Sequence, residues 1–178
     1  MKALTLWQPW ATLVALQQKK IETRSWGTTY RGTLAIHASK NMPPEAKALC
    51  QEQPFARALN WVDNHTNRLP LGAIVAVCEI ADVRDIVVFE NSAKLRKYNF
   101  ATLANEYLDL PREPERSFGD YTPGRYTWFL SNIRALVRPI PCRGYQQLWD
   151  VTADIEAVIN EQLRAKDSAK THDQLPRF

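Results

Sequence analysis

Apolar residues recur with a period of two near both ends of the first forty residues and with helical spacing between them. This pattern predicts a strand at residues 3–7, a helix at 10–17 with Pro9 at its first helical position, and a strand at 33–38. Residues 20–26 are expected to be extended. The N-terminal part is therefore predicted to run strand, short helix, charged strand, strand.

The most strand-like run in the chain covers residues 73–83 and is apolar on both faces, which predicts a central strand. Glu79 falls on the same face as Val75 and Val77. Because an unpaired buried charge costs several kcal/mol, we expect this carboxylate to find a cation or strong donors, or to take up a proton. The other expected elements are helices at 44–51 and 56–65, a long strand at 125–138, a short last strand at 145–151, and a helix at 154–166 with a frayed end from Asp167.

The composition changes between residues 84 and 123, where charged residues and prolines are frequent and the periodicity is mixed. We expect a helix near residues 101–108 and a loop at 111–116, and we interpret 84–123 as an insertion into the domain. Such insertions are either lids over a site or surface decorations, and the sequence leaves both alternatives open.

Two opposite charges, a third cation and an indole crowd into residues 19–26. In an extended strand Glu22, Arg24 and Trp26 would share one face, while Ile21 would point the other way. Glu22 and Arg24 would lie about 6.5–7 Å apart, close enough to orient each other, with Lys19 at the turn where the strand begins. This face is either a functional site, an ordinary charged surface, or an ion pair that only pins two strands.

Composition limits the class of protein without fixing its function. A chain of 178 residues with 45% hydrophobic residues can form one domain with a real core, and a net charge of +4 permits an anionic partner. Cys50, Cys78 and Cys142 are too few and too far apart to suggest a disulfide framework or a zinc site. We find no signal-peptide pattern and no apolar run of the roughly 20 residues that a membrane helix needs. We therefore expect a soluble, cytoplasmic protein and leave its oligomeric state open.

Three motifs resemble the ASCH family, whose name stands for activating signal cointegrator homology. They are Leu-Trp-Gln-Pro-Trp-Ala at residues 6–11, Lys19-x-x-Glu22-x-Arg24, and Leu-Ala-Ile-His-Ala at residues 34–38. The family signature is Gly-x-Lys-x-x-Glu-x-Arg, and here Gln17 stands at the glycine. Since glycine gives easy access to a left-handed turn, we expect the loop before the strand to differ.

The similarity extends over about residues 3–151, because residues 119–128 and 143–149 look like the late strands of the larger bacterial and phage members. The resemblance implies an α+β fold, a small PUA-like β-barrel with flanking helices and a C-terminal helix, in a group of RNA-associated domains. Residues 1–151 would form the ASCH domain with the insertion at 84–123, and residues 152–178 the C-terminal helix and tail.

The function favoured by this resemblance and by the residues is binding of RNA or a modified nucleoside at the barrel mouth. Cationic side chains bind phosphates, and aromatic side chains stack on unpaired bases, each stacked base contributing about 1–3 kcal/mol to the binding free energy. Glu22 would orient Arg24 and accept from an exocyclic amine, or Gln8 would bind a base edge. Trp7 is expected in the core, whereas Trp10 fits the core or the site. The candidate ligand-binding residues are Lys19, Glu22, Arg24, Trp26, Tyr30, Arg31, His37, Lys40, Gln8 and Trp10.

A first enzymatic alternative is deacylation of 4-acetylcytidine, because some small bacterial members of the superfamily are amidohydrolases with a Thr, Lys and Glu catalytic set. The resemblance carries their Lys to Lys19 and their strand Glu to Glu79. Their Thr, however, corresponds to Glu22, which removes the hydroxyl that would accept the acyl group. Thr23 is adjacent but should face away, so Glu22 would have to activate a water instead.

A second enzymatic alternative is cleavage of single-stranded RNA. Lys19, Tyr30 and His37 would act as acid, base or phosphate clamp, with a divalent ion such as Mg²⁺. His37 also fits a purely structural role in its strand. No other cofactor is implied, since the sequence holds no His/Cys cluster.

Overall fold

The computed structural model of the protein describes residues 1–59 and 69–173. The expected helix at 56–65 begins within this range, as α3, and its later part lies outside the described residues. The elements are β1 (Lys2–Leu6), α1 (Trp10–Ala15), β2 (Ile21–Arg24), β3 (Thr33–Ala38), α2 (Pro44–Leu49), α3 (Phe55–Ala58), β4 (Ala73–Phe89), β5 (Ser92–Asn99), β6 (Ala104–Asp109), the 3₁₀ turn η2 (Glu115–Phe118), β7 (Tyr126–Pro141), β8 (Leu148–Asp150) and α4 (Ala153–Asp173).

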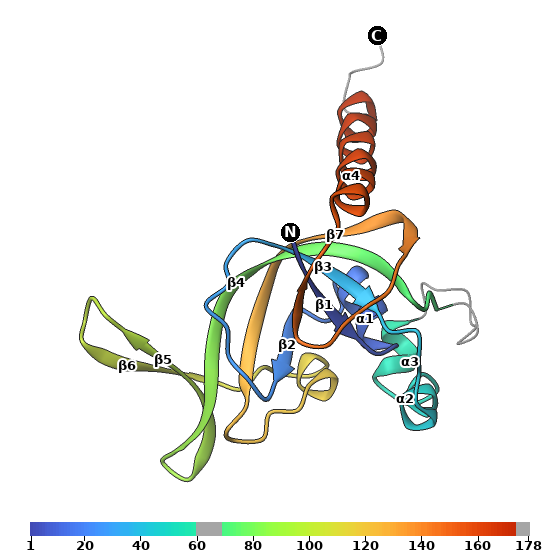
Figure 1. The fold of residues 1–178 in the computed structure, drawn as a ribbon. Helices are drawn as coiled ribbons and strands as arrows, with labels where there is room; N and C mark the ends of the chain where they lie inside the picture. Colours follow the sequence, from blue (N-terminus) through green and yellow to red (C-terminus); the bar gives the residue numbers. More distant parts are fainter. Residues whose placement is uncertain (60–68, 174–178) are drawn as a thin grey trace.

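The strands form one mixed, strongly curved sheet in the order β2-β7-β4-β3-β1-β8, from which β5 and β6 extend as an arm (Figure 1). β1 and β3 run parallel, and the other strand pairs are antiparallel. β4 and β7 form the longest ladder, from Ala73 opposite Pro141 to Asp85 opposite Tyr126. The predicted α+β fold, a barrel-like sheet with flanking helices and a C-terminal helix, is confirmed.

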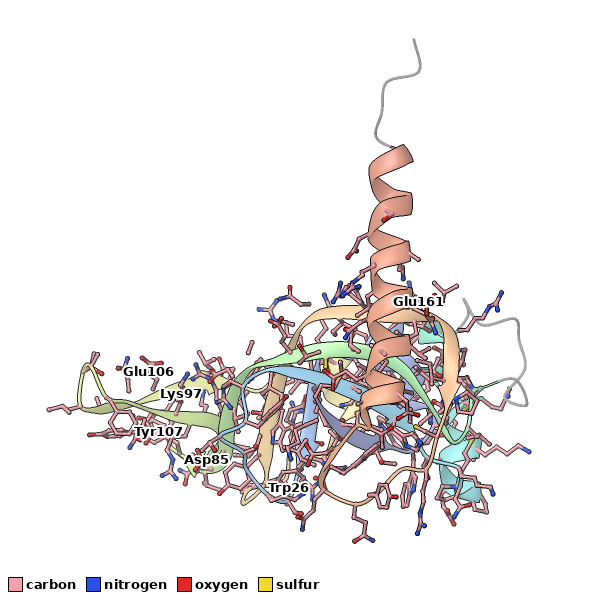
Figure 2. The ribbon with its side chains drawn as sticks, turned by 45° about the horizontal axis from the view of Figure 1, so that its top comes forward. Trp26, Asp85, Lys97, Glu106, Tyr107 and Glu161 are labelled. Atoms are coloured by element: carbon pink, nitrogen blue, oxygen red, sulfur yellow. The ribbon has the colours of Figure 1, made fainter. Side chains whose placement is uncertain are left out.

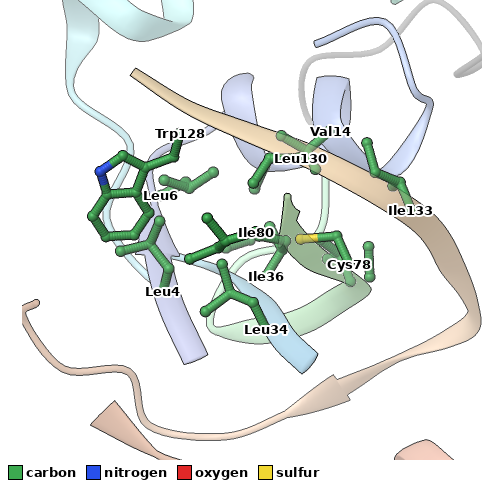
Figure 3. Packing of buried hydrophobic residues seen from close by; sticks show 14 residues of the cluster. Leu4, Leu6, Val14, Leu34, Ile36, Cys78, Ile80, Trp128, Leu130 and Ile133 are labelled. Atoms are coloured by element: carbon green, nitrogen blue, oxygen red, sulfur yellow. The ribbon is translucent and has the colours of Figure 1, made fainter. Parts of the chain in front are cut away.

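Alternation along the strands divides the core between the two faces of the sheet. The inner face packs Leu34, Ile36 and Trp128 with Val14 of α1 (Figure 3). The outer face packs Ala35 and neighbouring strand residues against α4. A strand with both faces covered has to be apolar throughout, which is why β4 reads as a continuous apolar run over its first half.

A separate cluster of buried side chains joins the short helices to η2. Leu13 of α1, Cys50, and Phe55 of α3 surround Phe118, which is almost fully buried. The rings of Phe55 and Phe118 meet edge to face, with centroids 5.0 Å apart. The segment before β7 is thereby fixed to the helices.

Residues 101–108 do not form the expected helix, because residues 104–109 are strand β6, paired along its length with β5. The two strands form a hairpin arm that projects from the body (Figure 1). The local sequence is compatible with a helix, but the partners of this segment lie on other strands: Asp109 pairs with Lys94 of β5, and the Tyr107 ring stacks on that of Phe89 at the end of β4, with centroids 4.1 Å apart. Cross-strand pairs of this kind decide the outcome over local propensity.

Three smaller expectations are also corrected. Trp7 is 54% exposed rather than part of the core, because β1 ends at Leu6 and its alternation does not continue. Glu79 is exposed and accepts a hydrogen bond of 2.8 Å from Asn132, since the register of the β4–β7 ladder shifts next to it. The C-terminal helix does not fray at Asp167 but continues as helix α4 to residue 173.

All three cysteines are free thiols, and burial raises the pKa of Cys78 to about 12. Over the described ranges, the structure contains no helix with the length and apolar character needed to cross a membrane.

The contact between α4 and the outer face of the sheet provides a test of the fold. Ile159→Ala removes a fully buried side chain, so we expect the free energy of unfolding to fall by about 2–5 kcal/mol. The matched control is Val158→Ala on the exposed side of the same helix, with an expected change within about 0.5 kcal/mol. Chemical denaturation measures both, and equal small losses would mean that α4 does not dock as described.

Candidate nucleic-acid interface

The charged strand β2 lies at one edge of the sheet and pairs with β7, which places Glu22 opposite Trp128 and Arg24 opposite Tyr126. Its side chains alternate as predicted. Ile21 packs into a cluster under the arm, and Thr23 on the same side accepts a hydrogen bond of 2.9 Å from a main-chain N–H. Thr23 therefore faces away from the charged face, as expected.

Lys19 is the most buried charge in this region, with only 1% of its surface exposed. Its ammonium donates to the main-chain carbonyl of Ile21 and, at 2.9 Å, to that of Phe118. The third neighbour is the Glu22 carboxylate at 3.4 Å. Two hydrogen bonds to main-chain carbonyls and one ion pair therefore compensate the buried charge, and Lys19 connects β2 to the segment that contains Phe118.

The turn before β2 keeps a left-handed residue although the family glycine is absent. Gln17 has φ of +58°, a conformation that glycine adopts more easily. Its side-chain amide donates to the carbonyl of Ile133 at 3.0 Å, and its N–H donates to the carbonyl of Val14 at 2.8 Å. The residue at the family's glycine position is thus left-handed in this chain, and its conformation is held by these two hydrogen bonds.

A carboxylate from η2 fixes the start of β2. The two oxygens of Glu115 accept hydrogen bonds from the main-chain N–H groups of Lys20, at 2.8 Å, and Ile21, at 3.0 Å. Together with the Phe118 carbonyl, this makes η2 the support of the charged strand. Nothing in the local sequence around Glu115 indicated that role.

Above Lys19 the site opens to solvent through Arg24 and Trp26. Glu22 lies 3.6 Å from the Arg24 guanidinium, which is 26% exposed and lies 6.0 Å from the Trp26 ring centroid. Trp26 in turn meets Trp128 edge to face at 4.6 Å. Arg24 Nε and Trp128 Nε1 are buried donors with no acceptor among the described residues. Buried donors are nearly always satisfied, and since Arg24 is partly open to solvent, its unpaired Nε can take an acceptor from outside.

A large groove adjoins this face on the side of the arm. It has a volume of about 1010 Å³. Tyr126, the cross-strand partner of Arg24, lies against Gly27, where a Cβ atom would come within 2.9 Å of the ring. Figure 2 shows Trp26 on the body and Asp85 and Lys97 toward the arm. The groove is lined by Gly27, Thr28, Thr29, Arg31, Val83, Asp85, Arg96, Lys97, Tyr98, Asn105 and Tyr126.

The loop before β3 supplies two further predicted residues. Tyr30 donates its hydroxyl proton to the carbonyl of Thr33 at 2.7 Å, and its ring packs against the core cluster rather than lining the groove. Arg31 is exposed, lines the groove, and donates to the carbonyl of Thr28 at 3.1 Å.

The remaining predicted residues lie elsewhere. Gln8 is fully buried and bridges Pro70 and Thr12. Trp10 is half-buried and packs edge-on against Phe55 at 5.9 Å. Neither side chain is open to a ligand in this arrangement. His37 and Lys40 line a different hollow, and Glu79 is paired with Asn132.

Several residues of this interface were not found from the sequence. Tyr126 and Trp128 lie in the stretch that resembles the late family strands, but the sequence does not show which strand they face. Arg96, Lys97 and Tyr98 belong to the arm, which was expected to contain a helix. No group of three or more His, Cys, Asp or Glu side chains within the described residues is arranged to hold a metal ion.

The sequence matches the ASCH domain family over residues 4–140. Activating signal cointegrator 1 from Mus musculus and from Homo sapiens are each 23% identical over 167 residues, which is 93% of this chain and 25% of each relative. The chain thus spans about a quarter of the length of these curated relatives.

Crystal structures of an ASCH protein from Zymomonas mobilis are also similar. The superposition with a mutant form covers 90% of this chain and 96% of the Zymomonas mobilis chain, with 11% sequence identity and a TM-score of 0.47. The superposition with the unmutated protein covers 92% of this chain and 93% of the Zymomonas mobilis chain, with 12% sequence identity and a TM-score of 0.46.

The curved mixed sheet with a charged edge strand and flanking helices defines a domain of the PUA-like class, a class of RNA-binding folds. The family match covers most of the chain, and the protein belongs to the ASCH domain family. The resemblance noted from the three motifs is confirmed.

The buried ammonium leads to a prediction for stability. Lys19→Met leaves the Glu22 carboxylate without its buried partner, so we expect the free energy of unfolding to fall by about 3–5 kcal/mol. The double variant with Glu22→Leu should recover part of this loss. Lys20→Met changes the neighbouring exposed lysine and serves as the control. Chemical denaturation measures the free energy of unfolding of each variant. If Lys19→Met lowers it by no more than Lys20→Met does, the ammonium does not support the site.

Proposed function

We propose that this protein binds single-stranded RNA, with one unpaired or modified nucleoside held at Arg24 and Trp26 and the adjoining strand in the groove beside the arm. The observation that carries this proposal is the unsatisfied buried donor Arg24 Nε beside the partly exposed indole of Trp26. The proposal is also supported by the fold, because the chain belongs to the ASCH domain family and the PUA-like class is a class of RNA-binding folds.

The chemistry of the pocket suits a nucleobase. The Arg24 guanidinium offers donors in a fixed plane, which suits a base carbonyl or a phosphate oxygen. Trp26 offers a partly exposed ring for stacking, and its edge contact with Trp128 limits its movement. Glu22, held between Lys19 and Arg24, is the acceptor in reach of an exocyclic amine.

The groove suits the sugar-phosphate chain on one side of that base. Arg31 binds main-chain carbonyls and has no carboxylate partner among the described residues, so its remaining donors are available to phosphate. Arg96 and Lys97 are each paired with an aspartate, Asp85 and Asp82 respectively. Arg31 should therefore contribute more to phosphate binding than either arm cation. Tyr98 and Tyr126 add rings for further bases.

Lys19 has a different role in this proposal than direct contact with phosphate. Its ammonium is buried, donates to two main-chain carbonyls and lies beside the Glu22 carboxylate. It positions Glu22, which in turn orients Arg24. For the same reason, a binding test should not replace Lys19, since a loss of folding would be mistaken for a loss of contact.

Affinity for a short fluorescently labelled single-stranded RNA carrying one 4-acetylcytidine provides the test. We expect Arg24→Gln to weaken binding roughly tenfold, because it removes a charge-assisted contact. Trp26→Leu should weaken it about 5- to 150-fold, the equivalent of about 1–3 kcal/mol of stacking. Arg57→Gln, on exposed α3, is the matched control and should bind as the wild type does. Fluorescence anisotropy measures the affinities, and thermal melting verifies that each variant is folded.

Salt dependence separates the phosphate contact from the base contact. Arg31→Gln should reduce the slope of log affinity against log salt concentration by about 0.7, the value for one phosphate contact on a single strand. The same oligonucleotide with cytidine in place of 4-acetylcytidine shows whether the modified base is preferred. Equal affinity of folded Arg24→Gln, Trp26→Leu and the control would refute this site.

The same RNA distinguishes binding from turnover. After incubation with the protein and Mg²⁺, chromatography with mass detection would show loss of the acetyl group for an amidohydrolase or chain scission for a ribonuclease. We expect the oligonucleotide to be recovered unchanged, because the Lys19 ammonium is buried and bound to main-chain carbonyls, and Glu79 lies on the surface beside Asn132.

A further inference from the structure

The hairpin arm carries a large part of the exposed apolar surface of the protein. Within the described residues eleven large hydrophobic side chains are exposed, and six of them lie between residues 88 and 108. These six are Val88, Phe89, Tyr98, Phe100, Leu103 and Leu108. Since soluble monomers rarely gather exposed apolar side chains in one region, this concentration is typical of a surface that binds another macromolecule.

The outer edge of β6 is free. Over the described residues β6 pairs with β5 alone, and its main chain makes no hydrogen bond outside that ladder. Five of its six residues are exposed. Natural edge strands are usually protected by a lysine, a proline or a bulge. The sequence Ala-Asn-Glu-Tyr-Leu-Asp of β6 has neither lysine nor proline, and its register is regular, so this edge can accept a further strand.

The other edges of the sheet are protected. On β2 the main-chain N–H of Ile21 is bound by Glu115, and its carbonyl is bound by Lys19. Beyond β2, the edge of β7 at residues 133–138 is bound by the side chains of Gln17, Lys166 and Gln162. β8, at the far end of the sheet, has only three residues. The free edge of β6 is therefore an exception in the described part of this fold.

The charges of the arm do not favour a nucleic acid at this edge. Every cation of β5 already has a carboxylate partner. The pairs are Lys94 with Asp109, Arg96 with Asp85, and Lys97 with Asp82. Glu90 and Glu106 add negative charge to the hairpin. Because a polyanion would find no unpaired cation along β5 and β6, the partner of this edge is a protein strand.

The side chains of β6 are complementary to a second copy of the same strand. Glu106 and Tyr107 point to opposite faces of the hairpin (Figure 2), so Asn105, Tyr107 and Asp109 share one face. When two copies pair antiparallel with Tyr107 opposite its own equivalent, Asn105 of each copy lies opposite Asp109 of the other. The amide can donate to the carboxylate, and the two tyrosines form a cross-strand aromatic pair. Glu106 then lies opposite Leu108, so that no like charges meet.

Neighbouring registers are less suitable. A shift by one residue sets Asn105 opposite Leu108, which removes the hydrogen bonds between amide and carboxylate. A shift by two residues toward the tip sets Glu106 opposite its own equivalent, and like charges directly opposite are destabilising. A shift by two residues toward the root leaves only residues 107–109 of the two strands paired with each other. Charge and hydrogen bonding therefore favour the pairing about Tyr107.

We propose that this protein forms a two-fold symmetric dimer by antiparallel pairing of β6 with β6 of a second copy, about Tyr107. The two arms then form one sheet in the order β4-β5-β6-β6-β5-β4. Because Tyr107 lies opposite its own equivalent, the symmetry axis is perpendicular to this sheet, and the groove-lining Asn105 of both copies is on the same side. The dimer does not depend on RNA binding, since Arg24 and Trp26 take no part in the contact.

Sedimentation equilibrium over a series of protein concentrations tests the proposal. One pair of short strands is a small interface, so we expect wild-type protein to pass from monomer to dimer as its concentration rises to about 1 mM. Asn105→Asp places a carboxylate opposite Asp109 twice in each dimer and should weaken dimerisation at least about tenfold. The matched control Asn41→Asp makes the same change at an exposed position off the arm and should dimerise as the wild type does.

An exchange of the two side chains tests the register. Asn105→Asp combined with Asp109→Asn again sets an amide opposite a carboxylate, so the double variant should recover most of the lost affinity. The exposed ion pair of Asp109 with Lys94, which this variant also removes, contributes little. A double variant that dimerises no better than Asn105→Asp would refute the pairing about Tyr107. Arg24→Gln should dimerise as the wild type does, so a failure of RNA binding and a failure of dimerisation are separate results.

Cysteine cross-linking tests the direction of the strands. Tyr107→Cys brings two thiols opposite each other and should give a disulfide-linked dimer on mild oxidation. Thr102→Cys should not, because the tip of one arm lies beside the root of the other in an antiparallel pair. Wild-type protein gives the background from its three native thiols. Equal cross-linking of both variants, or wild-type protein that stays monomeric at every concentration, would overturn the proposal and leave the edge to a strand of a different protein.

Discussion

The buried ammonium of Lys19 is the interaction on which the candidate interface depends. Its acceptors come from two separate parts of the chain, the start of β2 and the carbonyl of Phe118 in η2. Because an ammonium without acceptors is costly to bury, these parts have to meet for the chain to fold. The ring of Phe118 is in turn locked among the short helices. The charged strand, the segment before β7 and the helical cluster therefore form one connected unit. The position of Glu22 depends on all three parts.

This arrangement separates charges that hold the structure from charges that face solvent. Lys19 and Glu22 are buried, whereas Arg24 remains partly open with one donor unsatisfied. The ion pairs of Glu22 with Lys19 and Arg24 set the direction of the Arg24 guanidinium, so that little conformational freedom would be lost when a ligand binds.

Short-range patterns in the sequence predicted most of the elements and the local geometry of the site. Alternation correctly placed Glu22 and Arg24 on one face, because the period of a strand is a property of the backbone alone. What failed depended on distant partners. Glu79 turned outward because of a register shift against β7, and the arm replaced a helix because its pairs are cross-strand. Gln17 also depends on a distant partner. Its left-handed backbone is supported by a side-chain hydrogen bond to a carbonyl more than a hundred residues away in the sequence.

The hairpin arm of β5 and β6 has a consequence for how such a domain can change over time. The ladder of β4 and β7 reaches its end at Asp85 and Tyr126, and beyond that point the arm is held mainly by its own cross-strand pairs. Residues can be added to or removed from its tip, where Phe100 and Leu103 are exposed, without disturbing the core. The groove is lined by the arm from Arg96 to Tyr98 and Asn105, a pair close to its tip. Variation in its length would therefore alter what the groove accepts while leaving the folding of the body unchanged, so that specificity and stability are free to evolve separately.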